Sequence, residues 1–164
     1  MNFEEIYQKL FKRILSYIVS RTGNMEVAED IACKTWQHAY DKQHQFDSQK
    51  GSPEQWIFTI ARNEVNKHFR FWQLRRFFSL TEQEENVKGS DKMPLDVLEE
   101  HEKRQKLLEA LTCLAARERD LVSLKFQSGL NNRQIAEMTG LSESNVGTIL
   151  NRAINKLRTQ LERV

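Results

Sequence analysis

The chain has 164 residues and a mass of 19.4 kDa, which suits one ordinary domain or two small ones. It contains only 2 prolines and 6 glycines, which disfavours all-β and doubly wound folds because their tight turns depend on those residues. Charged residues make up 29% and hydrophobic residues 39%, a composition that excludes a disordered chain. No apolar run is long enough to span a membrane, and the first residues lack the basic region of a signal peptide.

Cysteine and histidine are too sparse to indicate a disulfide framework or a metal site. Cys33 and Cys113 lie in separate helical patterns, and the four histidines are scattered along the chain. We therefore expect a cytoplasmic protein with no metal and no cofactor.

Charge is distributed in three blocks. Residues 1–76 hold 12 Lys and Arg against 9 Asp and Glu, residues 77–106 hold 5 against 8, and residues 107–164 hold 8 against 6. Two mildly basic blocks on either side of an acidic one suit two modules that face nucleic acid. The imbalance is too small to predict DNA binding by itself.

The first block predicts three helices. Apolar residues from Phe3 to Ile18 recur at helical spacing, and Asn24 is a typical N-cap for a second helix. A polar loop follows over about 42–51. Ser52 then caps a third helix that continues towards Arg76, with Pro53 at its first position and Gln55 completing a capping box.

Periodicity is lost over about 79–93, which predicts a linker, and a fourth helix is expected over about 95–115. The next helix ends at Gly129, a short helix spans about 133–138, and Ser142 caps a final helix after a turn at Gly140. This is the spacing of a helix-turn-helix. The sequence thus predicts an all-α protein of two small helical domains, 1–78 and 95–164, joined by a flexible linker at 79–94.

In a helix-turn-helix the second helix enters the major groove, where exposed amide, basic and acidic side chains contact base edges. The candidate DNA-reading residues of the final helix are Glu143, Ser144, Asn145, Thr148, Asn151, Arg152, Asn155 and Lys156. The third helix carries amide and basic residues among aromatics, a pattern that suits phosphates and unpaired bases. Within that pattern, the spacing assigns Trp56 and Phe69 to packing and leaves Phe71 and Trp72 open.

Three runs of the first block and three of the last resemble regions 2 and 4 of the extracytoplasmic-function (ECF, group 4) sigma factors of bacterial RNA polymerase. The region 2 residues are Ala28-Glu29-Asp30-Ile31, Phe46-Asp47 and Trp56-Ile57-Phe58-Thr59-Ile60-Ala61-Arg62-Asn63. The region 4 residues are Gln134-Ile135-Ala136, Gly140-Leu141-Ser142, and Arg152-Ala153 followed by Lys156-Leu157-Arg158.

The resemblance implies a promoter-specific transcription initiation factor with three partners: core RNA polymerase (its clamp coiled coil and its flap), promoter DNA and an anti-sigma factor. It implies that the final helix reads the −35 element. It also implies polymerase contacts on the polar face of the second helix, through Glu29, Asp30, Cys33, Lys34 and Gln37. Capture of the −10 element would fall to Phe46, Asp47, Ser48, Lys50, Arg62, Asn63, Asn66, Lys67 and Arg70.

The chain departs from the family pattern in two places. Cys33-Lys34 stand where the family usually has Gln-Glu, and Gly147 and Asn151 stand where it often has basic residues. No phosphate loop, nucleophile elbow or paired carboxylate site is found in the sequence, so we do not expect an enzyme. A stand-alone helix-turn-helix regulator, or a pure interaction protein, remain the alternatives from the residues themselves.

Overall fold

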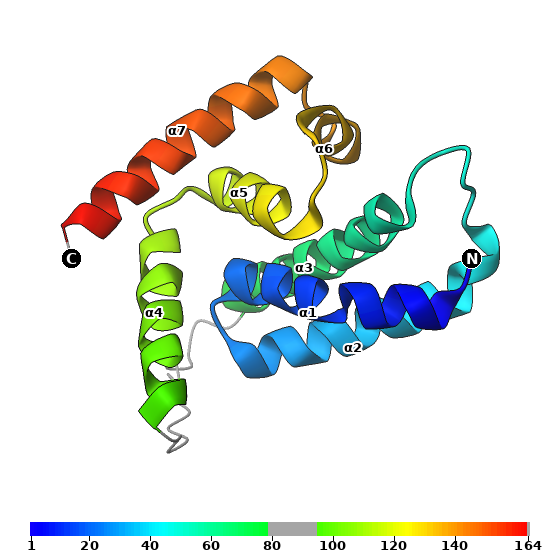
Figure 1. Ribbon diagram of the computed structural model, residues 1–164, viewed down its shortest axis with the longest axis horizontal. Coiled ribbons are helices and arrows are strands. Elements are labelled where there is room, and N and C mark those ends of the chain that lie inside the picture. Colours follow the sequence, from blue (N-terminus) through cyan, green and yellow to red (C-terminus); the bar gives the residue numbers. More distant parts are fainter. Residues whose placement is uncertain (79–94, 164) are drawn as a thin grey trace.

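The computed structural model describes residues 1–78 and 95–163. The secondary structure of these residues consists of helices joined by turns and loops, so the described part of the chain is all-α (Figure 1). The predicted linker at 79–94 lies outside the described residues. No helix in the described part of the chain is both long and apolar enough to cross a membrane.

Three helices form the N-terminal module: α1 (Phe3–Thr22), α2 (Met25–Lys42) and α3 (Pro53–Phe78). The Asn24 side chain accepts from the Val27 N–H at 3.0 Å, which caps α2 as predicted. Each helix turns an apolar stripe inward, so that Ile14, Ala28 and Phe58 are fully buried. A single 3-10 turn, Gln43–Gln45, opens the loop between α2 and α3.

The start of α3 differs in one detail from the expected capping box. The Ser52 hydroxyl accepts from the Gln55 N–H at 3.2 Å, which is the predicted half of the box. The Gln55 side chain instead donates to a carboxylate oxygen of Glu137 at 3.4 Å, 82 residues away in the chain. A long-range partner of Gln55 thus takes the place of the local Ser52 N–H, from which the Gln55 side chain would accept in a complete capping box.

Four helices form the C-terminal module: α4 (Leu95–Leu111), α5 (Ala116–Ser128), α6 (Asn132–Thr139) and α7 (Glu143–Glu162). The fourth helix is shorter than expected, because residues 112–114 form tighter turns after Leu111. Gly129 and Gly140 end α5 and α6 with φ of 68° and 75°, a backbone region that favours glycine.

The two modules are in direct contact. Helix α5 packs against α1, and α3 contacts both α5 and α6 (Figure 1). The buried residues of both modules form one continuous apolar cluster, which includes Ile14 and Ile18 of α1 together with Leu121 and Leu124 of α5. Sequence periodicity left this arrangement open, because a helix stripe shows which face is buried and not which partner covers it.

Candidate nucleic-acid and polymerase surfaces

Helices α6 and α7 build the predicted helix-turn-helix. Asn131 and Ser142 cap them, each accepting from the N–H three residues on, at 2.9 and 3.1 Å. Ile135 and Ala136 of α6 pack with Val146 and Leu150 of α7 in the core. Because Val146 and Leu150 bury one side of α7 against α6, the opposite side of α7 is exposed to solvent.

All eight predicted DNA-reading residues of α7 are exposed. Their donors and acceptors are amide, hydroxyl, carboxylate and guanidinium groups, the types that distinguish base pairs in the major groove. The Thr148 hydroxyl also donates to the Ser144 carbonyl at 3.0 Å, so part of its capacity is used within the helix.

Lys156 differs from the other seven because it has an acidic partner. Its ammonium donates to both carboxylate oxygens of Glu118 at 2.8 and 3.0 Å. Glu118 also accepts the Ala115 N–H at 3.0 Å at the start of α5, where the Ala115 side chain offers no acceptor of its own. The bond from Lys156 is the main reason why the pKa of Glu118 lies below its ordinary value.

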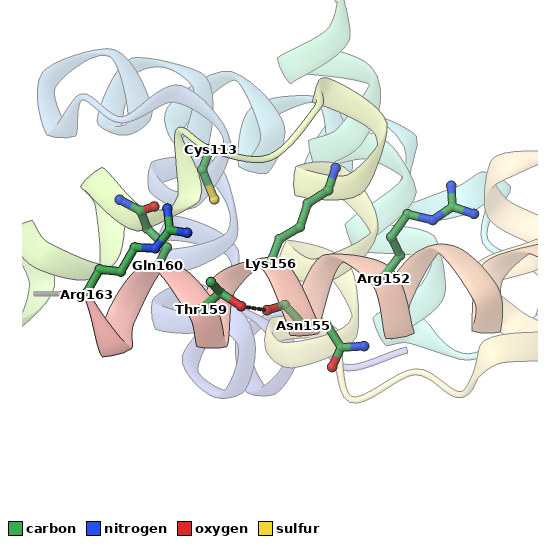
Figure 2. Close-up of a pocket in the computed structure, with 7 residues that line it drawn as sticks. All are labelled: Cys113, Arg152, Asn155, Lys156, Thr159, Gln160 and Arg163. Carbon is green, nitrogen blue, oxygen red and sulfur yellow. Dashed lines mark hydrogen bonds between the residues drawn. The ribbon is translucent and has the colours of Figure 1, made fainter.

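A shallow hollow of about 430 Å³ follows the C-terminal half of α7 and is drawn in Figure 2. Arg152, Lys156 and Arg163 supply basic groups to its lining, together with Cys113 from the turn before α5. In Figure 2 Arg152 and Lys156 extend on the side of α7 where Cys113 lies, whereas the Asn155 amide points away from it. Arg152 and Lys156 therefore extend to the same side of α7, and Asn155 extends to the other.

The polar face of α2 is arranged as predicted. Glu29, Asp30, Cys33, Lys34 and Gln37 are all exposed, while Ala28, Ile31, Ala32, Thr35 and Trp36 are buried on the opposite side. Cys33 is a free thiol. His68 of α3 has a pKa below its ordinary value because of burial first and the charge of Lys34 second.

The predicted −10 residues fall into two groups. Ser48, Lys50, Asn63, Lys67 and Arg70 are exposed, and Phe46 packs edge-on against Trp56 with ring centroids 5.6 Å apart. Asp47 stabilises the loop, since its carboxylate accepts from the Gln49 N–H at 2.9 Å.

Arg62 and Asn66 form the second group, because both are occupied by other protein groups. The Arg62 Nε donates to Asp120 of α5 at 2.8 Å, and the Asn66 side-chain oxygen accepts from Arg21 of α1 at 3.1 Å. Sequence reasoning missed Asp120 and Arg21, since neither lies near a recognisable motif. No local signal could have paired them with α3.

One aromatic residue of α3, Phe69, is more exposed than predicted. Trp56 is half-buried, whereas Phe69, which was assigned to packing, is 37% exposed. The Arg21 guanidinium covers the Phe69 ring at 5.6 Å from its centroid. Phe71 and Trp72 are exposed, so this end of α3 combines aromatic and basic side chains on the surface.

No group of three or more His, Cys, Asp or Glu residues that could hold a metal ion occurs in the described part of the chain.

Comparison with known proteins connects these surfaces to a family. The Sigma-70 region 2 family matches residues 6–73, and the Sigma-70, region 4 family matches residues 104–157. The ECF RNA polymerase sigma factor RpoE of Cereibacter sphaeroides is 29% identical over 166 residues, covering 97% of this chain and 86% of that protein. This chain belongs to the ECF sigma factors.

One similar ECF sigma factor has a longer chain. The sigma factor BldN of Streptomyces coelicolor is 28% identical over 155 residues, which cover 94% of this chain and 58% of BldN. The present chain thus spans less than two thirds of BldN.

The presence of region 2 shows that the alternative of a stand-alone helix-turn-helix regulator is wrong.

Two solved structures share the fold. The sigma factor RpoE in complex with the anti-sigma factor NepR, from Bartonella quintana, has a TM-score of 0.78 at 23% identity, covering 98% of this chain and 97% of that chain. CnrH in complex with the cytosolic domain of CnrY has a TM-score of 0.69 at 19% identity, covering 98% and 88%. As a sigma factor, this chain binds core RNA polymerase and promoter DNA in transcription initiation.

Proposed function

We propose that α7 reads the −35 element of a promoter while the N-terminal module binds core polymerase through α2 and captures the −10 element through α3 and its preceding loop. The observation that carries this proposal is the exposed face of α7, held by a buried helix-turn-helix in the same chain as a region 2 module.

The chemistry of α7 favours direct readout of bases. Asn145, Asn151 and Arg152 carry groups that can form paired hydrogen bonds with adenine or guanine in the major groove. Their positions in the first three turns of α7 match the part of a recognition helix that reaches base edges. The N-terminus of α7 adds free N–H groups that suit a phosphate.

The chemistry of α3 and its loop favours separated strands. Lys67 and Arg70 offer exposed positive charge for phosphates, and the nearby aromatic rings of Phe71 and Trp72 offer stacking surfaces. Unstacking one base costs a few kcal/mol, which contacts of this kind can offset.

The role of the protein is recognition, and the polymerase supplies the chemistry, so we infer that the chain is not an enzyme. We expect an anti-sigma factor as a further partner. Of the two solved structures that share the fold, RpoE is in complex with the anti-sigma factor NepR, and CnrH is in complex with the cytosolic domain of CnrY. We infer a cytoplasmic location from these partners.

Transcription on genomic DNA tests the proposal directly. Sigma-free core polymerase is combined with this chain, and the start sites are mapped with and without it. Discrete new start sites that share −35 and −10 elements support the proposal. Their absence, under conditions where the chain binds duplex DNA by itself, contradicts it.

Single substitutions test the role proposed for each surface. Arg152→Ala and Asn145→Ala should each weaken −35 binding by about 1–3 kcal/mol, and mainly for the cognate sequence. Arg104→Ala, an exposed arginine on α4, is the matched control. Glu29→Arg should abolish polymerase binding, with Glu102→Arg on α4 as the control. Normal holoenzyme formation by Glu29→Arg would refute the polymerase-facing role of α2.

A further inference from the structure

The last ten residues of α3 leave the core of the N-terminal module. Every residue from Phe69 to Phe78 is exposed, whereas earlier turns of the same helix bury Ile57, Phe58 and Val65. This segment makes about three turns, and a helix of that length is marginal by itself in water. Most helical stability in proteins comes from packing of an apolar face, so the end of α3 gains little of it within the chain.

Four large apolar side chains at this end of α3 face solvent. Phe71 and Leu74 are 57% and 60% exposed, and Phe77 and Phe78 are each 79% exposed. At about 100° of rotation per residue, Phe71, Leu74 and Phe78 fall within one arc of about 60°, and Phe77 lies to one side of it. A single exposed leucine or phenylalanine is ordinary, but a group at helical spacing indicates a contact surface. We call these four residues the apolar stripe.

Basic residues surround the apolar stripe. Lys67 lies on the same side of α3 one turn before it, and the rotation of the helix places Arg70 and Arg75 on its two flanks. Arg76 adds a fourth basic residue, and residues 65–78 contain no Asp or Glu. The charge of this end of α3 is therefore complementary to an anionic surface.

The two remaining aromatic side chains of the segment are partly covered by guanidinium groups. Arg21 lies 5.6 Å from the centroid of the Phe69 ring, and Arg75 lies 5.3 Å from the centroid of the Trp72 ring. Phe69 and Trp72 are 37% and 44% exposed, less than any member of the apolar stripe. Cation–π contacts thus shield the rings on the inner side of the helix, and the outer side keeps the larger exposed apolar area.

A lipid surface fits this combination better than nucleic acid does. Leucine has no π-face to stack on a base, and the apolar stripe has no amide, hydroxyl or carboxylate group to read one. At a bilayer, apolar side chains enter the boundary between headgroups and acyl chains, while the long stems of arginine and lysine let their charges reach the headgroups. The cytoplasmic leaflet of a cell membrane is anionic, which matches the charge of this segment.

The sequence alone predicted no membrane contact by this chain, because no apolar run is long enough to span a bilayer. A helix at the bilayer surface needs no such run, since it lies in the plane of the headgroups and buries one face only. We propose that the end of α3 binds the surface of an anionic lipid bilayer through the apolar stripe, with Lys67, Arg70 and Arg75 contacting headgroup phosphates. The contact is peripheral and reversible, because only a short face is buried.

Co-sedimentation of the full chain with lipid vesicles tests the proposal. Vesicles of phosphatidylcholine alone are compared with vesicles that also contain the anionic lipid phosphatidylglycerol, each at low and at raised salt concentration. We expect the chain to bind the anionic vesicles at least about tenfold more strongly, because each basic side chain near the surface adds attraction. The difference should shrink as salt screens the charges.

A double variant, Leu74→Gln with Phe78→Gln, removes half of the apolar stripe and keeps every charge. Glutamine is a good helix former and both side chains are exposed, so α3 should keep its helix, which circular dichroism checks. Binding to the anionic vesicles should fall about tenfold or more, because two large side chains no longer leave water. Phe126→Gln with Leu161→Gln makes the same changes at exposed residues of α5 and α7, and this matched control should bind like the wild type.

Three results would overturn the proposal, and each has a different meaning. Equal binding by the wild type and the Leu74→Gln, Phe78→Gln variant would show that charge alone attracts the chain. Equal loss in the matched control would show that exposed apolar area anywhere on the protein is enough. If the wild-type chain sediments with neither kind of vesicle, the apolar stripe is not a lipid surface. Loss of core polymerase or promoter binding by the same variant would then assign the stripe to that macromolecule.

Discussion

Gly147 is a glycine inside α7, and replacing it with alanine should stabilise the protein. Glycine in a helix interior costs about 1 kcal/mol relative to alanine because it loses more backbone freedom on folding. An added Cβ at this position would lie 3.7 Å from Asn132 Nδ2, which is ordinary van der Waals contact. No steric penalty offsets the gain, so we expect about 0.5–1 kcal/mol of added stability.

Urea unfolding followed by circular dichroism measures this change. The midpoint should rise with the slope unchanged, and the melting temperature should rise by about 2–4 °C for each kcal/mol in a chain of this size. A loss of stability in Gly147→Ala would refute the reasoning, because it would mean that α7 is not a regular helix with open space at this position.

Gly140→Ala is the matched control, since it makes the same chemical change in the same module with the opposite expected sign. Nothing lies within 4 Å of the added Cβ, but φ is 75°. The left-handed conformation costs a non-glycine residue about 1–2 kcal/mol. The pair of variants therefore separates backbone conformation from packing.

Two other predictions concern charge. Lys67→Ala and Arg70→Ala should each weaken DNA binding evenly across sequences and lower the slope of log K against log salt concentration by about 1. Lys12→Ala on α1 is the control and should leave this slope unchanged. An unchanged slope in the first two variants would show that neither side chain contacts a phosphate. Glu118→Gln should destabilise the protein by about 1 kcal/mol near neutral pH, because it removes the carboxylate that Lys156 contacts. The pKa of Glu118 is lowered in the folded state, so its stabilisation is present above its ordinary pKa and is lost as the pH falls through the lowered value. Urea midpoints of the wild type and Glu118→Gln should therefore converge in acid, and a constant difference from neutral to acid pH would contradict the assignment.

The sequence predicted the helices because their signals are local. The N-caps Asn24, Ser52 and Ser142 accept from N–H groups three residues away, and Gly129 and Gly140 end helices that they follow directly. Each of these interactions lies within one turn of helix, so residue types at fixed spacing are enough to place it. The exposed face of α7 was predictable for the same reason, since its buried face has helical periodicity.

The tertiary structure decided which polar groups remain available. Arg117-Glu118-Arg119-Asp120 has the charge pattern of an exposed helix start, yet Glu118 and Asp120 are both buried. Asp120 meets Arg62 across 58 residues of sequence and Arg21 across 99. Helical periodicity carries no information about such pairs, because it describes one element at a time.

The amino-acid sequence by itself therefore determined the helices, their ends, the exposed face of α7 and the family, since all of these depend on residue types at short, regular spacing. Only the tertiary structure decided that α5 packs on α1, that Asp120 occupies Arg62, and that Lys156 lies on Glu118. The physical reason is that a buried charge takes whichever opposite charge the packing of helices brings within reach, however far apart the two lie in the chain.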